Sequence, residues 1–121
     1  MPPPISEILI CKSCQISCGA NGFVDAVADA LNRSDQADGF IVREVECMNN
    51  CDAPISLALQ GEGLATYFFA GIEADKDVED IINTCRTYRQ SEGGWIEDAR
   101  DCGSLRLKLQ ARVPAINPRE R

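Results

Sequence analysis

The spacing of hydrophobic residues predicts four strands and two helices before the C-terminal part of the chain. Apolar residues occupy both faces of 5–11, as is typical of a covered central strand, and the segments 40–47, 55–60 and 64–71 predict three more strands. The segments 21–32 and 74–91 instead repeat apolar residues every three or four positions, which predicts helices. The apolar stripe of the second helix consists of Val78, Ile81, Ile82, Cys85 and Tyr88.

The C-terminal stretch alternates apolar and polar residues. Basic or amide residues separate the apolar ones, which are Leu105, Leu107, Leu109, Ala111 and Val113. A period of two predicts a strand with one apolar face. Two interpretations remain open: an edge strand that closes the sheet, or a strand that packs on a second copy of the chain in a homodimer.

The order of these elements predicts an α/β fold, β-α-β-β-β-α, with an extra C-terminal strand. The first two strands are expected to be parallel through a right-handed crossover, and the following hairpin to extend the mixed sheet. This is the thioredoxin-like arrangement. We expect a single domain over residues 1–121, in which 103–121 form a C-terminal extension of one strand and a tail.

Charge is unevenly distributed along the chain. Residues 1–101 hold 7 Lys and Arg against 18 Asp and Glu, a net of −11, whereas 102–121 hold 5 against 1, a net of +4. The acidic body argues against nucleic-acid binding, because phosphates would be repelled. It either keeps the surface solvated or steers a basic partner. The absence of a basic leader and of a membrane-length apolar run predicts a cytoplasmic protein without membrane contact.

The chain has seven cysteines and no histidine, which limits the metal sites and catalytic groups that it can form. An odd number of thiols in a reducing cytosol is not expected to form a disulfide framework. The lack of histidine excludes Cys/His zinc fingers, Rieske-type ligation and a Cys–His catalytic pair. Any metal site must therefore use thiolates. Cys85 lies on the apolar stripe of a helix and is expected in the core, and Cys102 is expected to be an ordinary thiol in a loop.

The other five cysteines follow two neighbouring strands. Cys11 ends the first strand, and Cys14 and Cys18 come directly after it. Cys47 ends the second strand and Cys51 follows it. Because parallel strands end at the same edge of a sheet, C-x2-C-x3-C and C-x3-C are expected to converge there. The sequence thus predicts a site with five thiols available for four ligand positions.

The segment VECMNNCDAPISL, residues 45–57, resembles the second half of thioredoxin-like [2Fe–2S] ferredoxins and of the related small subunit of bacterial complex I and hydrogenases. These proteins place C-x3-C and an Ala-Pro dipeptide before a strand. The whole chain also resembles a bacterial family of predicted metal-binding proteins. The motifs that carry this resemblance are Cys11 and Cys14, Val45 to Cys51, Ala58 to Gln60, Ala65 to Phe69, Tyr88, Gly94 to Asp98 and Ala111 to Ala115.

The resemblance implies a [2Fe–2S] cluster held by Cys11, Cys14, Cys47 and Cys51. Cys18 is an alternative to Cys14, because the ferredoxins have a longer gap between their first two cysteines than C-x2-C. The implied function is one-electron transfer to or from a partner protein, a reductase or an oxygenase. The sequence contains no phosphate-binding loop, Ser/His/Asp set or H-E-x-x-H motif that would indicate an enzyme.

Two other functions remain open. C-x2-C with C-x3-C is also acceptable spacing for a four-cysteine zinc module of structural or regulatory function. Alternatively, Cys11 and Cys14 in CKSC lie between a strand and a helix, as in a thiol oxidoreductase. That interpretation leaves Cys47 and Cys51 unexplained.

Overall fold

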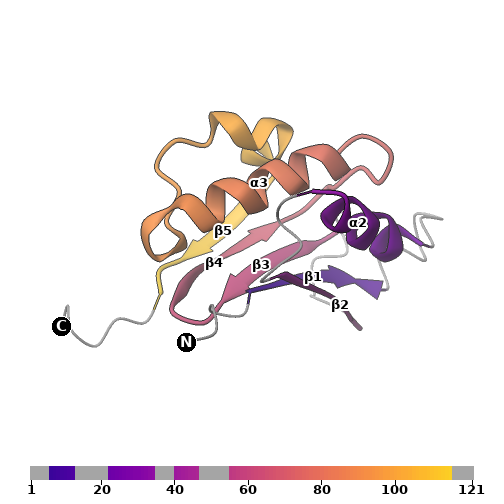
Figure 1. Cartoon of the computed structure of the whole chain (residues 1–121), viewed down its shortest axis with the longest axis horizontal. Helices are drawn as coiled ribbons and strands as arrows, with labels where there is room; N and C mark the ends of the chain where they lie inside the picture. The colour runs from indigo at the N-terminus through magenta and orange to yellow at the C-terminus, as the bar shows by residue number, and fades with distance from the viewer. Residues whose placement is uncertain (1–5, 13–21, 35–39, 47–54, 116–121) are drawn as a thin grey trace.

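A mixed five-stranded sheet organises the protein, seen in a computed structural model (Figure 1). The structure describes residues 6–12, 22–34, 40–46 and 55–115. The strands and α-helices are β1 (Ser6–Cys11), α2 (Phe23–Asn32), β2 (Phe40–Val45), β3 (Leu57–Gly61), β4 (Leu64–Phe69), α3 (Val78–Gln90) and β5 (Leu109–Val113). Two 3₁₀-helices, η1 (Glu92–Gly94) and η2 (Arg100–Leu107), connect α3 to β5.

The sheet has the strand order β2-β1-β3-β4-β5. β1 and β2 are parallel, as a crossover through α2 requires, and every other neighbouring pair is antiparallel. The predicted β-α-β-β-β-α order with an added C-terminal strand is therefore confirmed. β1 lies between β2 and β3, which explains why both of its faces are apolar.

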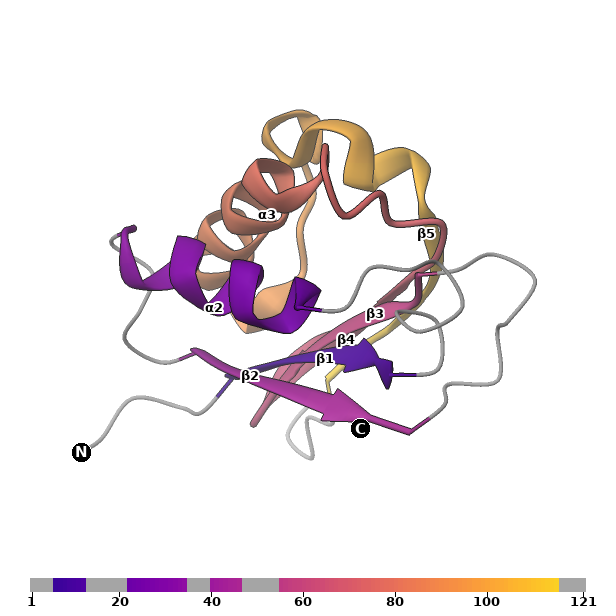
Figure 2. The same cartoon turned by 90° about the vertical axis from the view of Figure 1, so that its right-hand side faces the viewer.

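Both α-helices and η2 cover the same side of the sheet (Figure 2). The core lies between them and the strand residues that point towards them, including Ile8 and Ile10 of β1. α2 contributes Phe23, Val27 and Leu31, and α3 contributes Ile81, Ile82, Cys85 and Tyr88. The predicted helical stripes and the core position of Cys85 are thus confirmed, except that Val78 is only partly buried.

The alternating C-terminal stretch is a strand over only part of the predicted length. β5 begins at Leu109 and pairs with β4 at the edge of the sheet, which confirms the edge-strand interpretation. Leu105 and Leu107 lie instead in η2, where Leu105 is 1% exposed and Leu107 is 81% exposed. The prediction that these two leucines share a strand face is wrong, because a 3₁₀ backbone directs them to opposite sides.

Two carboxylates of the α3 region hold η2 in place. Ser104 donates from its backbone N–H to Asp80 Oδ2 at 3.1 Å, and its hydroxyl donates to Asp77 Oδ1 at 2.7 Å. Lys108 Nζ binds Asp77 Oδ2, and its carbonyl accepts from Ala70 N at 3.0 Å. These long-range bonds, which no local pattern encodes, stabilise the 3₁₀ turn in place of a longer strand.

Candidate metal-binding edge of the sheet

Cys11 lies at the carboxyl end of β1, in line with Val45 of the parallel strand β2. The Cys11 side chain is buried, and its Sγ lies 4.0 Å from the carbonyl oxygen of Glu46. On the other side, the Cys11 backbone N–H donates to the carbonyl of Ser56 at 3.1 Å. The end of β1 is therefore flanked by the residues that leave β2 and by those that enter β3.

Cys11 lies close to the residues on either side of the second cysteine motif. Residues 47–54 connect Glu46 to Ile55, and both ends of this connection lie against Cys11 through Glu46 and Ser56. The predicted convergence of the first two strand ends is thus confirmed at Cys11. Cys14, Cys18, Cys47 and Cys51 lie outside the described residues, so their assignment as ligands stays a prediction.

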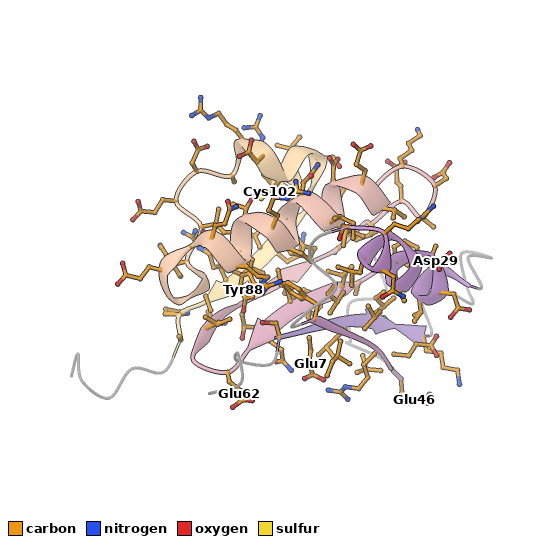
Figure 3. All side chains as sticks on the ribbon, viewed as in Figure 1. Glu7, Asp29, Glu46, Glu62, Tyr88 and Cys102 are labelled. Atoms are coloured by element: carbon orange, nitrogen blue, oxygen red, sulfur yellow. The ribbon has the colours of Figure 1, made fainter. Side chains whose placement is uncertain are left out.

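Cys85 belongs to α3 and Cys102 to η2 (Cys102 is labelled in Figure 3), so neither lies on the strands that form this edge, and both are buried. Cys102 is a buried residue of a 3₁₀-helix, which corrects the prediction of a loop position. Burial raises the pKa of both thiols, and the neighbouring Cys102 adds to the rise in the pKa of Cys85. Both are therefore held as thiols, the form that neither attacks as a nucleophile nor binds a metal.

The described segments contain no group of three or more Cys, Asp or Glu residues placed to hold a metal ion. Cys11 is the one predicted ligand that the described part of the chain includes. A complete ligand set must therefore include residues beyond those described. None of the described helices has the length and apolar character needed to cross a membrane.

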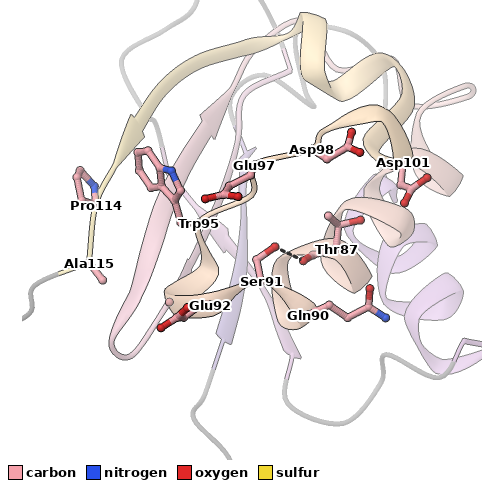
Figure 4. A pocket seen from close by; sticks show the side chains of 11 residues that line it. Thr87, Gln90, Ser91, Glu92, Trp95, Glu97, Asp98, Asp101, Pro114 and Ala115 are labelled. Atoms are coloured by element: carbon pink, nitrogen blue, oxygen red, sulfur yellow. Dashed lines mark hydrogen bonds between the residues drawn. The ribbon is translucent and has the colours of Figure 1, made fainter.

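A groove of about 750 Å³ lies at the opposite end of the sheet (Figure 4). It is formed by the last turn of α3, by η1 and the segment after it, and by the residues that follow β5. Trp95, Glu92 and Glu97 line it. The periodicity of the sequence does not predict this groove; the signal that the sequence offers is the pair of glycines in EGGW, which lets the chain turn directly before the tryptophan.

Comparison with known proteins identifies the fold and the family. The chain is similar to a solved structure described as a thioredoxin-like [2Fe–2S] ferredoxin from Aquifex aeolicus, with a TM-score of 0.54 and 13% sequence identity. The similarity covers 68% of this chain and 80% of that one, so the fold is thioredoxin-like, as predicted. No curated protein matches the sequence. The model of the family described as "Protein of unknown function (DUF1636)" matches residues 8–115, and the chain therefore belongs to that family.

Proposed function

We propose that this protein transfers single electrons by means of a [2Fe–2S] cluster held at the Cys11 edge of the sheet. The proposed ligands are Cys11, Cys14, Cys47 and Cys51, with Cys18 as the alternative to Cys14. The observation that carries the proposal is the position of Cys11 between Glu46 and Ser56, because these residues flank the segment that contains Cys47 and Cys51.

The residues available at this edge fit such a cluster. A [2Fe–2S] cluster takes four thiolates, two on each iron, and supplies reversible one-electron redox chemistry when bound. The chain contains no histidine, so the ligands of an iron–sulfur cluster would have to be cysteine thiolates. The Cys11 thiol is buried at a strand end, and the Cys11 backbone N–H is hydrogen-bonded to the Ser56 carbonyl, so the position of this residue is fixed by the sheet.

The thioredoxin-like fold supports the same conclusion. The similar solved structure is named as a [2Fe–2S] ferredoxin, although at 13% identity the likeness extends to the fold alone. Electron transfer requires exposure of a cluster edge to a partner rather than a substrate pocket. We therefore propose a carrier protein and not an enzyme, with a reductase or an oxygenase as the partner.

Anaerobic purification followed by a visible spectrum, iron analysis and acid-labile sulfide analysis tests the proposal. We expect a coloured protein with two irons and two sulfides per chain, the composition of one [2Fe–2S] cluster. Single Cys→Ser replacement at positions 11, 14, 47 and 51 is expected to abolish the spectrum, while Cys18→Ser keeps it. Cys85→Ala and Cys102→Ala are the matched controls, because both thiols are buried away from the edge.

Each contrary result would change the proposal in a different way. A colourless protein with one zinc and no sulfide would support the four-cysteine zinc module. A metal-free protein in which Cys11 and Cys14 form a reversible disulfide would support the thiol oxidoreductase. Loss of the spectrum in Cys18→Ser but not in Cys14→Ser would support the cluster, with Cys18 instead of Cys14 as its second ligand.

A further inference from the structure

The groove at the Trp95 end has a rigid aromatic wall. The guanidinium of Arg112 lies 3.8 Å from the centre of the Trp95 ring and donates to the Ile96 carbonyl at 3.0 Å. The Tyr67 hydroxyl donates to the Gly94 carbonyl at 2.9 Å and accepts from the Ile96 N–H at 2.7 Å. Because Tyr67 belongs to β4, these bonds fix the wall to the sheet, and the indole remains 37% exposed.

The floor of the groove is polar and anchored to a helix. The Ser91 hydroxyl donates to the Thr87 carbonyl at 2.7 Å, where α3 ends (Figure 4). Pro114 and Ala115, which follow β5, complete the side next to Trp95. The groove is therefore formed by two stretches of chain that the β4–β5 pairing brings together.

The groove carries more negative than positive charge, although Arg112 lies against its Trp95 wall. Its carboxylates are Glu92, Glu97, Asp98 and Asp101, and its lining contains no Lys or Arg. Arg100 binds Asp98 at 2.7 Å, and this hydrogen bond lowers the pKa of Asp98 to about 2. Within the described part of the chain, the other three carboxylates form no ion pair. They are available to a positively charged ligand.

We propose that this groove binds an extended segment of a partner protein that carries Lys or Arg side chains. The carboxylates are distributed along the groove rather than gathered, and no group of three in the described chain could hold a metal ion, which favours separated cationic side chains. Arg112 already stacks on the Trp95 ring, and the exposed part of the ring adds an aromatic surface that a partner side chain can contact. The same negative charge would repel the phosphates of a nucleic acid.

The position of the groove separates this contact from the proposed electron-transfer edge. β5 runs antiparallel to β4, so Val113 and the groove lie at the Ser6 end of the sheet, whereas Cys11 lies at the other end. A strand of the length of β1 places about 17 Å between its two ends. A partner can therefore be held by a basic segment while the Cys11 edge stays uncovered, and the inference does not depend on the presence of a cluster.

Trp95 provides the test, because it is the one tryptophan of the chain. The probe is a short end-capped peptide of alternating glycine and arginine. It is titrated against the full chain while tryptophan emission is recorded. The matching peptide of alternating glycine and glutamate is the charge control. We expect a saturable change with the arginine peptide alone. Glu92→Gln with Glu97→Gln should weaken binding about fivefold, the effect of losing two surface ion pairs.

The matched control is Asp25→Asn with Asp29→Asn, which removes the same charge from the exposed face of α2. Its dissociation constant should equal that of the unaltered chain. Equal weakening by both double variants would overturn the proposal in favour of diffuse attraction to the net charge, and the absence of saturable emission change would exclude the site. If binding appears only after Arg119→Ser and Arg121→Ser, the chain's own C-terminal segment occupies the groove, which also overturns the proposal.

Discussion

The two ends of the sheet carry different chemistry on the same five strands. At one end Cys11 is buried, with its thiol 4.0 Å from the Glu46 carbonyl and its backbone N–H bonded to the Ser56 carbonyl. At the other end the groove exposes carboxylates and the Trp95 ring to solvent. The first arrangement holds a thiol in a fixed position, and the second suits a charged partner that can dissociate.

The difference also concerns how each end is assembled. The Cys11 end follows directly from the parallel pairing of β1 with β2, which a strand–helix–strand unit determines. The groove depends on η1, on the segment after it and on β5. The Tyr67 hydroxyl of β4 binds Gly94 and Ile96, and β5 is held by backbone pairing with β4. We therefore expect the two ends to respond separately to local substitutions and together only to loss of the shared strand β5.

Truncation after Cys102 is expected to have the largest effect, because β5 reaches both ends of the sheet. It removes Leu105, whose burial contributes roughly 1.5–3 kcal/mol, and it removes Lys108 from the buried carboxylate of Asp77, which costs about 3–5 kcal/mol. The sum approaches the whole stability of a small domain, about 5–15 kcal/mol. Far-UV circular dichroism should show loss of the cooperative thermal transition.

A control for the truncation is Leu107→Ser. Leu107 belongs to the same segment but is solvent-exposed. Its replacement should change the free energy of unfolding by about 0.5 kcal/mol or less, as is usual for a surface substitution, and the melting temperature should change little. A truncated chain that melts like the full chain would show that β5 is dispensable at both ends.

Lys108→Met addresses the ion pair beside the Cys11 end. Asp77 is 2% exposed, and removal of its charged partner is expected to lower the free energy of unfolding by about 3 kcal/mol, measured by urea denaturation. Glu73→Gln is the control, because Glu73 contacts the same ammonium at 3.6 Å from a more exposed position and should cost less than about 1 kcal/mol. Equal losses in both variants would contradict a dominant Asp77–Lys108 pair.

The same pair predicts a pH dependence. Burial raises the pKa of Asp77, but the Glu73 N–H, Lys108 and Ser104 together outweigh it and lower that pKa below its ordinary value of 3.8. Asp77 therefore stabilises the fold above pH 3.8 and loses this contribution as the pH falls through its lowered pKa. Asp77→Asn should flatten the acid limb of the stability curve, and an unchanged acid limb would exclude Asp77 as its source.

Gly94→Ala disturbs the groove end alone. Gly94 has a φ of +72°, and an added Cβ would lie 2.7 Å from Cε1 of Tyr88. The left-handed backbone and the crowding together should cost about 2–4 kcal/mol and shift the Trp95 emission. Iron and sulfide content should stay unchanged in protein that remains folded, because Cys11 lies at the far end. Loss of metal in the folded variant would show that the two ends are coupled.

The smallest effect is expected on the side of the sheet away from the helices. Glu7 lies on that side (Figure 3), where Arg43 binds it at 2.9 Å and Gln60 donates to it at 3.1 Å. Arg43→Ser should change stability by less than about 1 kcal/mol, because the pair is solvent-exposed. A larger loss in thermal melts would show that this side is covered by another chain in solution.

Local periodicity determined most of the fold. The apolar pattern of β1, the helical stripes through Val27 and Ile81, and the placement of Cys85 in the core all followed from the spacing of side chains in regular backbone. The parallel arrangement of β1 and β2 followed from the crossover, and with it the placement of Cys11 next to the chain leaving β2. The ligands beyond Cys11 remain predictions from cysteine spacing and family resemblance.

Tertiary contacts decided what periodicity could not. The alternation from Leu105 to Val113 has the period of a strand, but that period has meaning only if the backbone is extended. Asp77 and Asp80, more than twenty residues earlier in the chain, bind Ser104 and Lys108 and stabilise a 3₁₀ turn there instead. The groove arises in the same way, since its walls come from stretches that only the β4–β5 pairing brings together, and no local pattern records a contact between distant residues.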